Sequence, residues 1–489
     1  MKRKGFLNSI TRWLDRRRRG GKGPATPSAG AGQEYLDQTV ATSGQVPRDV
    51  VIGVDLGTSC TKVVIRTPFA AGGRAVPVPF GKLGHPTCQF LLPTCLSVGV
   101  DRSLNLGTGD SGSVRNHLKR KLLDAALKSD ETQKEQAILE ATAYMAGYLG
   151  LALKYAREWF ESEERGAIKG FRPRWQVNIG IPSAGYADEP LKKAFLSAAK
   201  AGWYLSLDTG LIETGSAVAA AELALEGELE DEVEINVLPE VAAEVVGYAR
   251  SPLRRTGLHV IADAGASTLD ICGFVLHEHD GDDRYSLLNA DVSRLGVVAL
   301  HKLRRCALCE LCSGGFVDTV MEDPVAPIPE YWIDYMVDTE CDECANSLKS
   351  AEGEFVSTSV QALMGIIMSL KDELTPLASA FQDGIPLPLF LCGGGSFMSQ
   401  FQEVVDQAGS QLNHLTRVRA QLIRSPLPVP QDLDSELVDK QIFRRLAVAY
   451  GLSFNYDDIG TIDPPVGVEP IRPYRQIDWK ANYPDKDIE

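Results

Sequence analysis

Residues 51–65 read VIGVDLGTSCTKVVI, and this stretch decides the fold. Its small and β-branched residues alternate up to a break at Gly57 and resume at Val63, which predicts two antiparallel strands joined by a tight turn. Glycine lets backbone N–H groups come close to a ligand, and successive N–H groups in such a turn form a concavity for anions. Asp55, at the end of the first strand, suits a hydrated metal ion that bridges phosphate oxygens. On this stretch alone, an ordinary hairpin explains the pattern equally well.

Two later stretches repeat this design. Residues 258–276 read LHVIADAGASTLDICGFVL, with Asp263 at the end of an apolar strand, then a glycine turn, Asp270 and a second apolar strand. Residues 387–398 read LPLFLCGGGSFM, an apolar strand that runs into the glycine turn 393–396. Three strand-to-glycine turns, two of them with an aspartate at the strand end, favour a phosphate-binding site over three unrelated turns.

The order and spacing of these stretches resemble the actin-like ATPase superfamily, with its phosphate-1, phosphate-2 and adenosine motifs. Three further features narrow the resemblance to the ATPase domain of DnaK-type (seventy-kilodalton heat-shock) chaperones. They are the Lys-Arg helix at 114–127, the Ile-Pro strand end at 181–182, and the hinge-like LPEVAAEVVGYA at 238–249. The match follows motif order over roughly residues 50–455. It implies an α/β fold of two duplicated ribonuclease-H-like lobes, with the nucleotide in the cleft between them.

The resemblance implies a role for each matching residue. Asp55, Asp263 and Glu240 would organise Mg²⁺ and its waters, while Lys119 would reach the γ-phosphate or the attacking water, with Arg120 as the fallback. The nucleotide contacts would come from Gly57, Thr58, Ser59, Gly265, Ser267, Thr268, Gly393, Gly394, Gly395 and Ser396. Metal and cation would offset the charge on the transferring phosphoryl group while a carboxylate orients water.

Three positions complicate this assignment. Glu213 rivals Glu240, because it also precedes an Ala-rich helix, and choosing Glu240 implies an insertion that includes the acidic run 228–234. Ala266 stands where the family has glycine, and alanine tolerates positive φ poorly. The glutamate site also lacks the family's Glu-Pro order. We therefore expect nucleotide binding with slow hydrolysis.

Five cysteines lie in a region that the family generally lacks. Cys306, Cys309 and Cys312 are spaced C-x2-C-x2-C, and Cys341 and Cys344 form another C-x2-C pair. Paired thiolates at this spacing can close a tetrahedral zinc site, for which we choose the last four and leave the first spare. Iron–sulfur ligation and buried cysteines without a metal are the alternatives.

The N-terminal residues differ from the rest of the chain. Residues 1–20 combine a strong positive charge with apolar residues at helical spacing, and residues 21–48 have the composition of a flexible linker. Such an amphipathic helix can lie on an anionic membrane surface or dock on an acidic partner, and a disordered basic tail is the alternative. The segment lacks the apolar core and cleavage site of a secretory signal.

The net charge of −15 argues against nucleic-acid binding by bulk electrostatics, and 44% apolar residues suit a globular protein. No continuous apolar run reaches the length that crosses a bilayer. We therefore expect a cytoplasmic protein that can reach a membrane surface through its basic arm.

Apolar periodicity predicts helices at 114–127, 132–165, 187–203, 354–382 and 441–454. The resulting organisation is a basic arm (1–20), a linker (21–48), lobe I (49–250), lobe II (251–440) with a Cys-rich insertion (301–350), a helix returning to lobe I (441–455) and an irregular tail (456–489). This tail is too short to form a β-sandwich substrate domain.

These features predict an ATP- and Mg²⁺-binding, slowly hydrolysing, heat-shock-seventy-like chaperone or regulatory ATPase, with structural Zn²⁺ as a further cofactor. Closure of its lobes would be read by a protein partner or client supplied in trans. One alternative is an actin-like filament or membrane-tethered scaffold. Another is an iron–sulfur activator-type ATPase, a branch that DLGTSCTKVVI also resembles.

Overall fold

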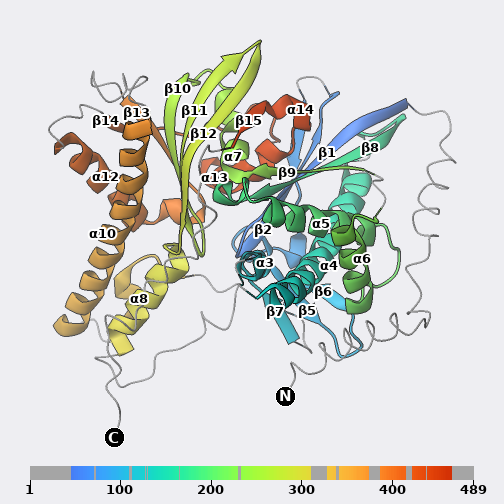
Figure 1. The fold of residues 1–489 in the computed structure, drawn as a ribbon, viewed down its shortest axis with the longest axis horizontal. Coiled ribbons are helices and arrows are strands. Elements are labelled where there is room, and N and C mark those ends of the chain that lie inside the picture. Colours follow the sequence, from blue (N-terminus) through green and yellow to red (C-terminus); the bar gives the residue numbers. More distant parts are fainter. Residues whose placement is uncertain are drawn as a thin grey trace, which may run out of the picture.

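The computed structural model describes residues 46–464, except 71–72, 109–112, 127, 129, 165, 230–232, 310–327, 337–340, 374–385, 415–420, 435 and 437. The fold is α/β, with two six-stranded sheets and one three-stranded sheet (Figure 1). The predicted basic arm and most of the linker lie outside the described residues, as does the chain from 465 onward.

The hairpin predicted at residues 51–65 opens the first sheet. β1 and β2 pair antiparallel, and β3 continues on the same side, whereas β8 and β9 add to the other edge of β1 in parallel. The strands of this sheet are β1 (Val46–Leu56), β2 (Cys60–Thr67), β3 (Arg74–Pro77), β4 (Leu92–Pro93), β8 (Phe171–Ile181) and β9 (Glu234–Pro239). β8 ends immediately before Pro182, as predicted.

The second sheet repeats this strand order. β10, β11 and β12 are antiparallel neighbours, and β13 and β14 add to the other edge of β10 in parallel. Its strands are β10 (Gly257–Ala264), β11 (Leu269–His279), β12 (Asp282–Ser293), β13 (Pro386–Cys392), β14 (Gln421–Arg424) and β15 (Thr461–Asp463). β15 pairs with β12, so the region from 456, expected to be irregular, begins with an ordered helix and strand.

Helices connect the strands in both halves of the chain. They are α3 (Leu118–Ala126), α4 (Glu131–Glu163), α5 (Glu189–Ser206), α6 (Thr214–Glu226), α7 (Glu240–Ala249), α8 (Val297–Cys309), α10 (Asp342–Glu373), α12 (Ser399–His414), α13 (Lys440–Leu452) and α14 (Tyr456–Ile459). Four short 3-10 helices complete the described chain: η1 (Gly81–Leu83), η2 (Ser183–Gly185), η3 (Trp332–Tyr335) and η4 (Gly394–Phe397).

Two predicted helices have different bounds from those expected. The segment 114–127 begins as a strand, β7 (Ser113–Asn116), which pairs with β5 (Cys95–Val98) beside β6 (Leu104–Leu106). His117 has a φ of 54°, and this left-handed backbone conformation separates β7 from α3. The helix predicted at 354–382 begins earlier, with α10, inside the expected Cys-rich insertion, and its last predicted residues lie outside the described chain.

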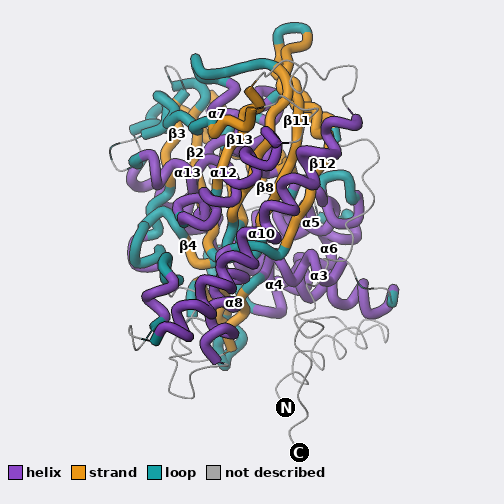
Figure 2. Tube along the Cα trace, turned by 90° about the vertical axis from the view of Figure 1, so that its left-hand side faces the viewer, coloured by secondary structure: helices purple, strands orange, loops and turns teal. Residues whose placement is uncertain are grey.

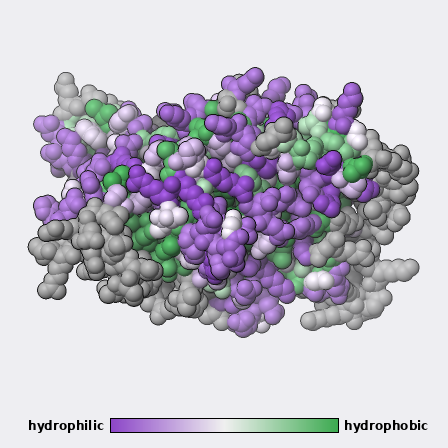
Figure 3. Space-filling view, turned by 90° about the horizontal axis from the view of Figure 1, so that it is seen from above, coloured by the Kyte–Doolittle hydropathy of each residue, from purple (hydrophilic) through white to green (hydrophobic). Residues whose placement is uncertain are grey.

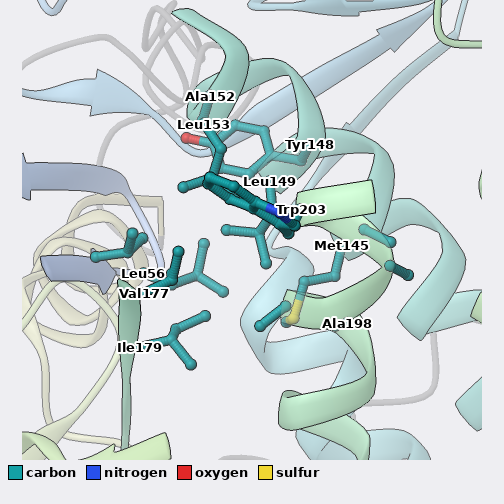
Figure 4. Close-up of a cluster of buried hydrophobic side chains, with 14 of the residues drawn as sticks. Leu56, Met145, Tyr148, Leu149, Ala152, Leu153, Val177, Ile179, Ala198 and Trp203 are labelled. Atoms are coloured by element: carbon teal, nitrogen blue, oxygen red, sulfur yellow. The ribbon is translucent and has the colours of Figure 1, made fainter. Parts of the chain in front are cut away.

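The first core lies between the first sheet and the helices α4 and α5. Val177 and Ile179 of β8 face Met145 and Leu149 of α4, and Trp203 of α5 closes the cluster (Figure 4). Each large apolar side chain buried in this way contributes roughly 1.5–3 kcal/mol to folding. This core fixes the position of β1 and therefore of the turn after it.

The second core lies between the second sheet and the helices α10 and α12, which face the viewer in Figure 2. By length and composition alone, the segment Asp342–Leu370 of α10 could cross a membrane, and 44% of its most apolar window is buried. Its apolar side chains, including Phe355 and Ile367, pack in the second core, which accounts for that composition. From above, the described surface is mostly hydrophilic, with hydrophobic residues in small groups (Figure 3).

Each half of the chain, one around each six-stranded sheet, contributes a helix that packs against the sheet of the other half. We call α7 and α13 the exchanged helices. α7 comes after the first sheet in the chain, yet its Val245 and Tyr248 pack with Phe274 and Phe390 of the second sheet. α13 comes after the second sheet, yet it contacts β1, β2 and α7. Both helices therefore lie between the two sheets (Figure 1).

Candidate functional site

The first strands of the two sheets carry aspartates at the same position in their hairpins. Asp55 in β1 lies opposite Lys62 in β2, and Asp263 in β10 lies opposite Asp270 in β11. Lys62 Nζ donates to Asp55 Oδ2 at 2.9 Å, so the positive charge of Lys62 balances the negative charge of Asp55 within the first hairpin. The second hairpin places two carboxylates opposite each other, which is unfavourable without a further cation.

A buried ion pair lies within electrostatic reach of both hairpins. Lys119 in α3 donates to Oε1 of Glu240, the first residue of α7, at 2.5 Å. Each residue is only 7% exposed. Burial acts to lower the pKa of Lys119, but the charges of Glu240, Asp270 and Asp55 raise it above its ordinary value. The pair therefore joins residues far apart in sequence into one charged cluster.

Burial and neighbouring negative charges disfavour the ionised form of the carboxyl groups in this cluster. Burial, followed by the charges of Glu240 and Asp55, raises the pKa of Asp263 to about 6. Burial, followed by the charge of Asp263, raises the pKa of Asp270 to about 8. In the described part of the chain, Oδ1 of each aspartate is buried without a hydrogen-bond partner. Buried carboxylate oxygens without donors are the groups that a cation stabilises most.

The three glycine turns shape the space beside these carboxylates. A Cβ on Gly393, which has a φ of 76°, would lie 2.0 Å from Asp263 Oδ1. A Cβ on Gly296 would lie 2.5 Å from the backbone of the 265–268 turn, where the first N–H groups of α8 donate to Gly265 and Ala266 carbonyls. Ala266 is not among the described residues with positive φ, so alanine fits this turn without strain.

The predicted hydroxyl donors differ in what they can offer a ligand. Thr58, Ser59 and Ser267 are half-buried turn residues. The Thr268 hydroxyl is directed to Asp270, and the Ser396 hydroxyl donates to the Gly393 carbonyl at 2.7 Å. The last two therefore stabilise the protein's own turns.

The structure separates the two candidate glutamates. Glu213 is exposed and caps α6, where its N–H donates to Ser216 Oγ at 3.1 Å. Glu240 lies with Lys119 in the charged cluster, so it is the glutamate that the fold brings to the site. Arg120, the fallback for Lys119, is half-buried and pairs with Asp124 at 3.5 Å. Of the expected insertion at 228–234, residues 230–232 lie outside the description, and Glu234 begins β9.

Three residues of the cluster were not assigned from the sequence. Lys62 and Asp270 each come after their strand-end aspartate by the same spacing, and that shared spacing could have identified them. Glu244, one turn after Glu240 in α7, had no such signal. Burial, followed by the charge of Asp263, raises the pKa of Glu244 well above its ordinary value.

The residues present fit a hydrated Mg²⁺ ion. Among the residues that the structure describes, no group of three or more His, Cys, Asp or Glu side chains could hold a metal ion directly. Mg²⁺ retains several waters and is typically bound through one or two carboxylates and substrate phosphates. Asp263, whose Oδ1 has no donor in the described chain, and Asp55 are the side chains that could hold such an ion.

The cysteine pair of the predicted zinc site lies at the start of α10. The Sγ atoms of Cys341 and Cys344 are 2.8 Å apart, and the Cys344 N–H donates to Cys341 Sγ at 3.3 Å. Leu308, near the end of α8, packs with Cys344, and Cys309 is the last residue of that helix. Cys312 lies outside the described residues. The fold thus brings the end of α8 next to the second C-x2-C pair.

No model of a known protein family matches the chain, and no curated protein does.

Asp270 gives the ligand-free protein a specific pH dependence. Its folded pKa of about 8 lies above its ordinary value of 3.8, so the folded state binds this proton more tightly than the unfolded state. The contribution of Asp270 to stability is then most favourable below about pH 4 and falls as the pH rises toward 8. Asp270→Asn should remove this loss and raise the free energy of unfolding at pH 8 by at least about 2 kcal/mol, as urea denaturation with a metal chelator would measure.

The matched control is Asp280→Asn, at the exposed tip of the β11–β12 hairpin, where the φ of 56° suits asparagine. It should follow the pH dependence of the wild type. An Asp270→Asn variant with the same slope as the wild type between pH 6 and 8 would contradict the assigned titration.

Proposed function

We propose that this chain is a Mg-ATP-binding protein with a two-lobed actin-like fold, most similar in its site to the ATPase domain of DnaK-type chaperones. The observation that carries the proposal is the convergence of Asp55, Asp263 and the Lys119–Glu240 pair beside glycine turns. An electronegative cluster with carboxylate oxygens that lack donors suits a metal ion, and the glycine turns suit phosphates.

The duplicated topology supports the two-lobed part of the proposal. Both sheets have three antiparallel strands with two parallel strands added beyond the first strand. The exchange of α7 and α13 means that any rotation of one half against the other must bend or slide these helices. In this proposal, α7 and α13 form the joint between the halves. Nucleotide-dependent closure moves this joint, and a protein partner recognises the change.

Hydrolysis would proceed by positioning. The bound metal ion would offset the charge that develops on the phosphoryl group. Asp55 and Asp263 orient the waters of the site, and Lys119 supplies a positive charge that Glu240 holds in place. Gly393, Gly394 and Gly395 form the turn against which adenosine would lie. Because Lys119 and Lys62 are already held by carboxylates, we expect slow turnover.

Calorimetric titration of Mg-ATP and Mg-ADP into the full chain tests this function, with phosphate release followed in parallel. The wild type should bind both, and Asp263→Asn should weaken binding by more than about tenfold, because it removes a charge-assisted ligand of the metal. Asp280→Asn, an exposed change in the same sheet, should bind as the wild type does. A folded wild type that binds neither nucleotide would refute the proposal.

We further propose that Cys309, Cys312, Cys341 and Cys344 hold a structural zinc ion, supported by the contact of α8 with the 341–344 pair. Purified protein should then contain about one zinc per chain, and Cys344→Ser should lose it and melt at a lower temperature. Cys306→Ser, which changes the exposed cysteine of α8, is the control and should retain zinc. Metal-free wild type with an unchanged melting temperature would contradict the site, and a brown protein with bound iron would favour the iron–sulfur alternative.

A further inference from the structure

Two neighbouring arginines of α13 lie against the glycine turn of the second half. The guanidinium carbons of Arg444 and Arg445 lie 5.4 Å and 5.7 Å from the ring centroid of Phe397 in η4. The Arg445 guanidinium carbon is also 3.9 Å from the position that a Cβ on Gly394 would occupy. Its charged end therefore lies beside the turn after β13.

Arg445 also acts on the turn of the first hairpin. Burial raises the pKa of Cys60, and the positive charges of Lys62 and Arg445 act in the opposite direction. Cys60 begins β2, directly after the 57–59 turn. A half-buried guanidinium thus lies beside the 393–396 turn and within electrostatic reach of the first-hairpin turn.

The positively charged side chains near the site differ in whether a carboxylate is already paired with them. Lys62 is paired with Asp55 at 2.9 Å, and Lys119 is paired with Glu240 at 2.5 Å. Within the described ranges, Arg445 forms neither a hydrogen bond nor an ion pair, and its guanidinium lies over the Phe397 ring. A guanidinium without a carboxylate partner in the described chain, beside the turn assigned to adenosine and within electrostatic reach of the first-hairpin turn assigned to phosphate, retains its donors for an incoming anion.

We propose that Arg445 binds a phosphate group of the nucleotide and thereby makes affinity depend on the phosphates more than on the nucleoside. The inference rests on the proposed function, since it assigns a residue to that site. Arginine suits the role because its planar donors can contact two phosphate oxygens at once. Because α13 is one of the two exchanged helices, a phosphate contact there also ties the bound nucleotide to the joint between the halves.

The test compares adenosine, Mg-ADP, Mg-ATP and Mg-pyrophosphate by competition against a fluorescent nucleotide on the full chain. Arg445→Ala should weaken binding of the three phosphate-bearing probes by about 10- to 100-fold and leave adenosine unchanged. Arg445→Lys should recover part of the loss, because it keeps the charge and loses the planar fork. Arg444→Ala, which removes the same charge and ring contact one residue earlier, should change affinity by less than about fivefold.

Each outcome bears on the proposal. Equal loss of adenosine and Mg-ATP affinity in a variant that melts as the wild type does would show a nucleoside contact and overturn the phosphate role. Unchanged Mg-ATP affinity, or an equal loss in Arg444→Ala, would also overturn it. A wild type that binds no probe would overturn the proposed function, which separates that failure from failure of this inference alone.

Discussion

Replacing Gly451 with alanine should lower the free energy of unfolding by about 3 kcal/mol. Gly451 lies in α13 where this helix crosses α7, and an added Cβ would lie 1.8 Å from the Ala243 carbonyl oxygen and 2.5 Å from its carbonyl carbon. These are backbone atoms of a buried helix, so no flexible side chain can move aside. The two helices would have to separate, which would also loosen the contacts of α13 with β1 and β2. Urea denaturation measures the loss.

The matched control is Gly353→Ala in α10, where an added Cβ meets nothing within 4 Å. Because alanine favours a helix over glycine, this variant should be more stable by roughly 0.5–1 kcal/mol. The same chemical change thus has opposite signs at two helical glycines, and only the helix crossing distinguishes them. A Gly451→Ala protein as stable as the wild type would show that α7 and α13 do not cross closely at this residue.

The sequence predicted the parts of the fold that depend on local pattern. The two hairpins, the strand before the 393–396 turn and the helices α4, α5 and α13 follow from alternation, glycine breaks and helical periodicity. Asp55, Asp263 and Glu240 could be identified because each lies at the boundary between a strand and a turn or helix. That boundary is visible in a single stretch of sequence.

The remaining features depend on contacts between distant parts of the chain. Lys62 and Asp270 become informative only when the hairpin register places each opposite an aspartate. Glu213 and Glu240 both precede Ala-rich helices, and only the tertiary fold brings Lys119 of α3 to one of them. β15 is too short to stand out, because its strand character comes from pairing with β12. The sequence contains no periodicity that indicates the exchange of α7 and α13 between the halves, so this exchange could not be predicted from periodicity.

The second large effect is expected from Lys119→Met. The substitution keeps most of the side-chain volume and removes the charge, so Glu240 stays buried near Asp55 and Asp263 without its partner. Removing one member of a buried ion pair costs about 3–5 kcal/mol, and we expect that loss in urea denaturation at pH 8. The exposed Lys121 of the same helix provides the control, and Lys121→Met should change stability by less than about 0.5 kcal/mol.

The double variant Lys119→Met/Glu240→Gln distinguishes the contribution of the ion pair to stability from its contribution to hydrolysis. With both charges removed, no unpaired carboxylate is buried at this position, so stability should return close to that of the wild type. Phosphate release should stay about 100-fold or more below the wild-type rate, because the charge that stabilises the transferring phosphoryl group is absent. Recovery of stability together with hydrolysis would mean that the pair serves folding alone. Recovery of stability without hydrolysis would assign the Lys119–Glu240 pair a role at the nucleotide beyond folding, because the double variant restores the fold and lacks only the two charged groups.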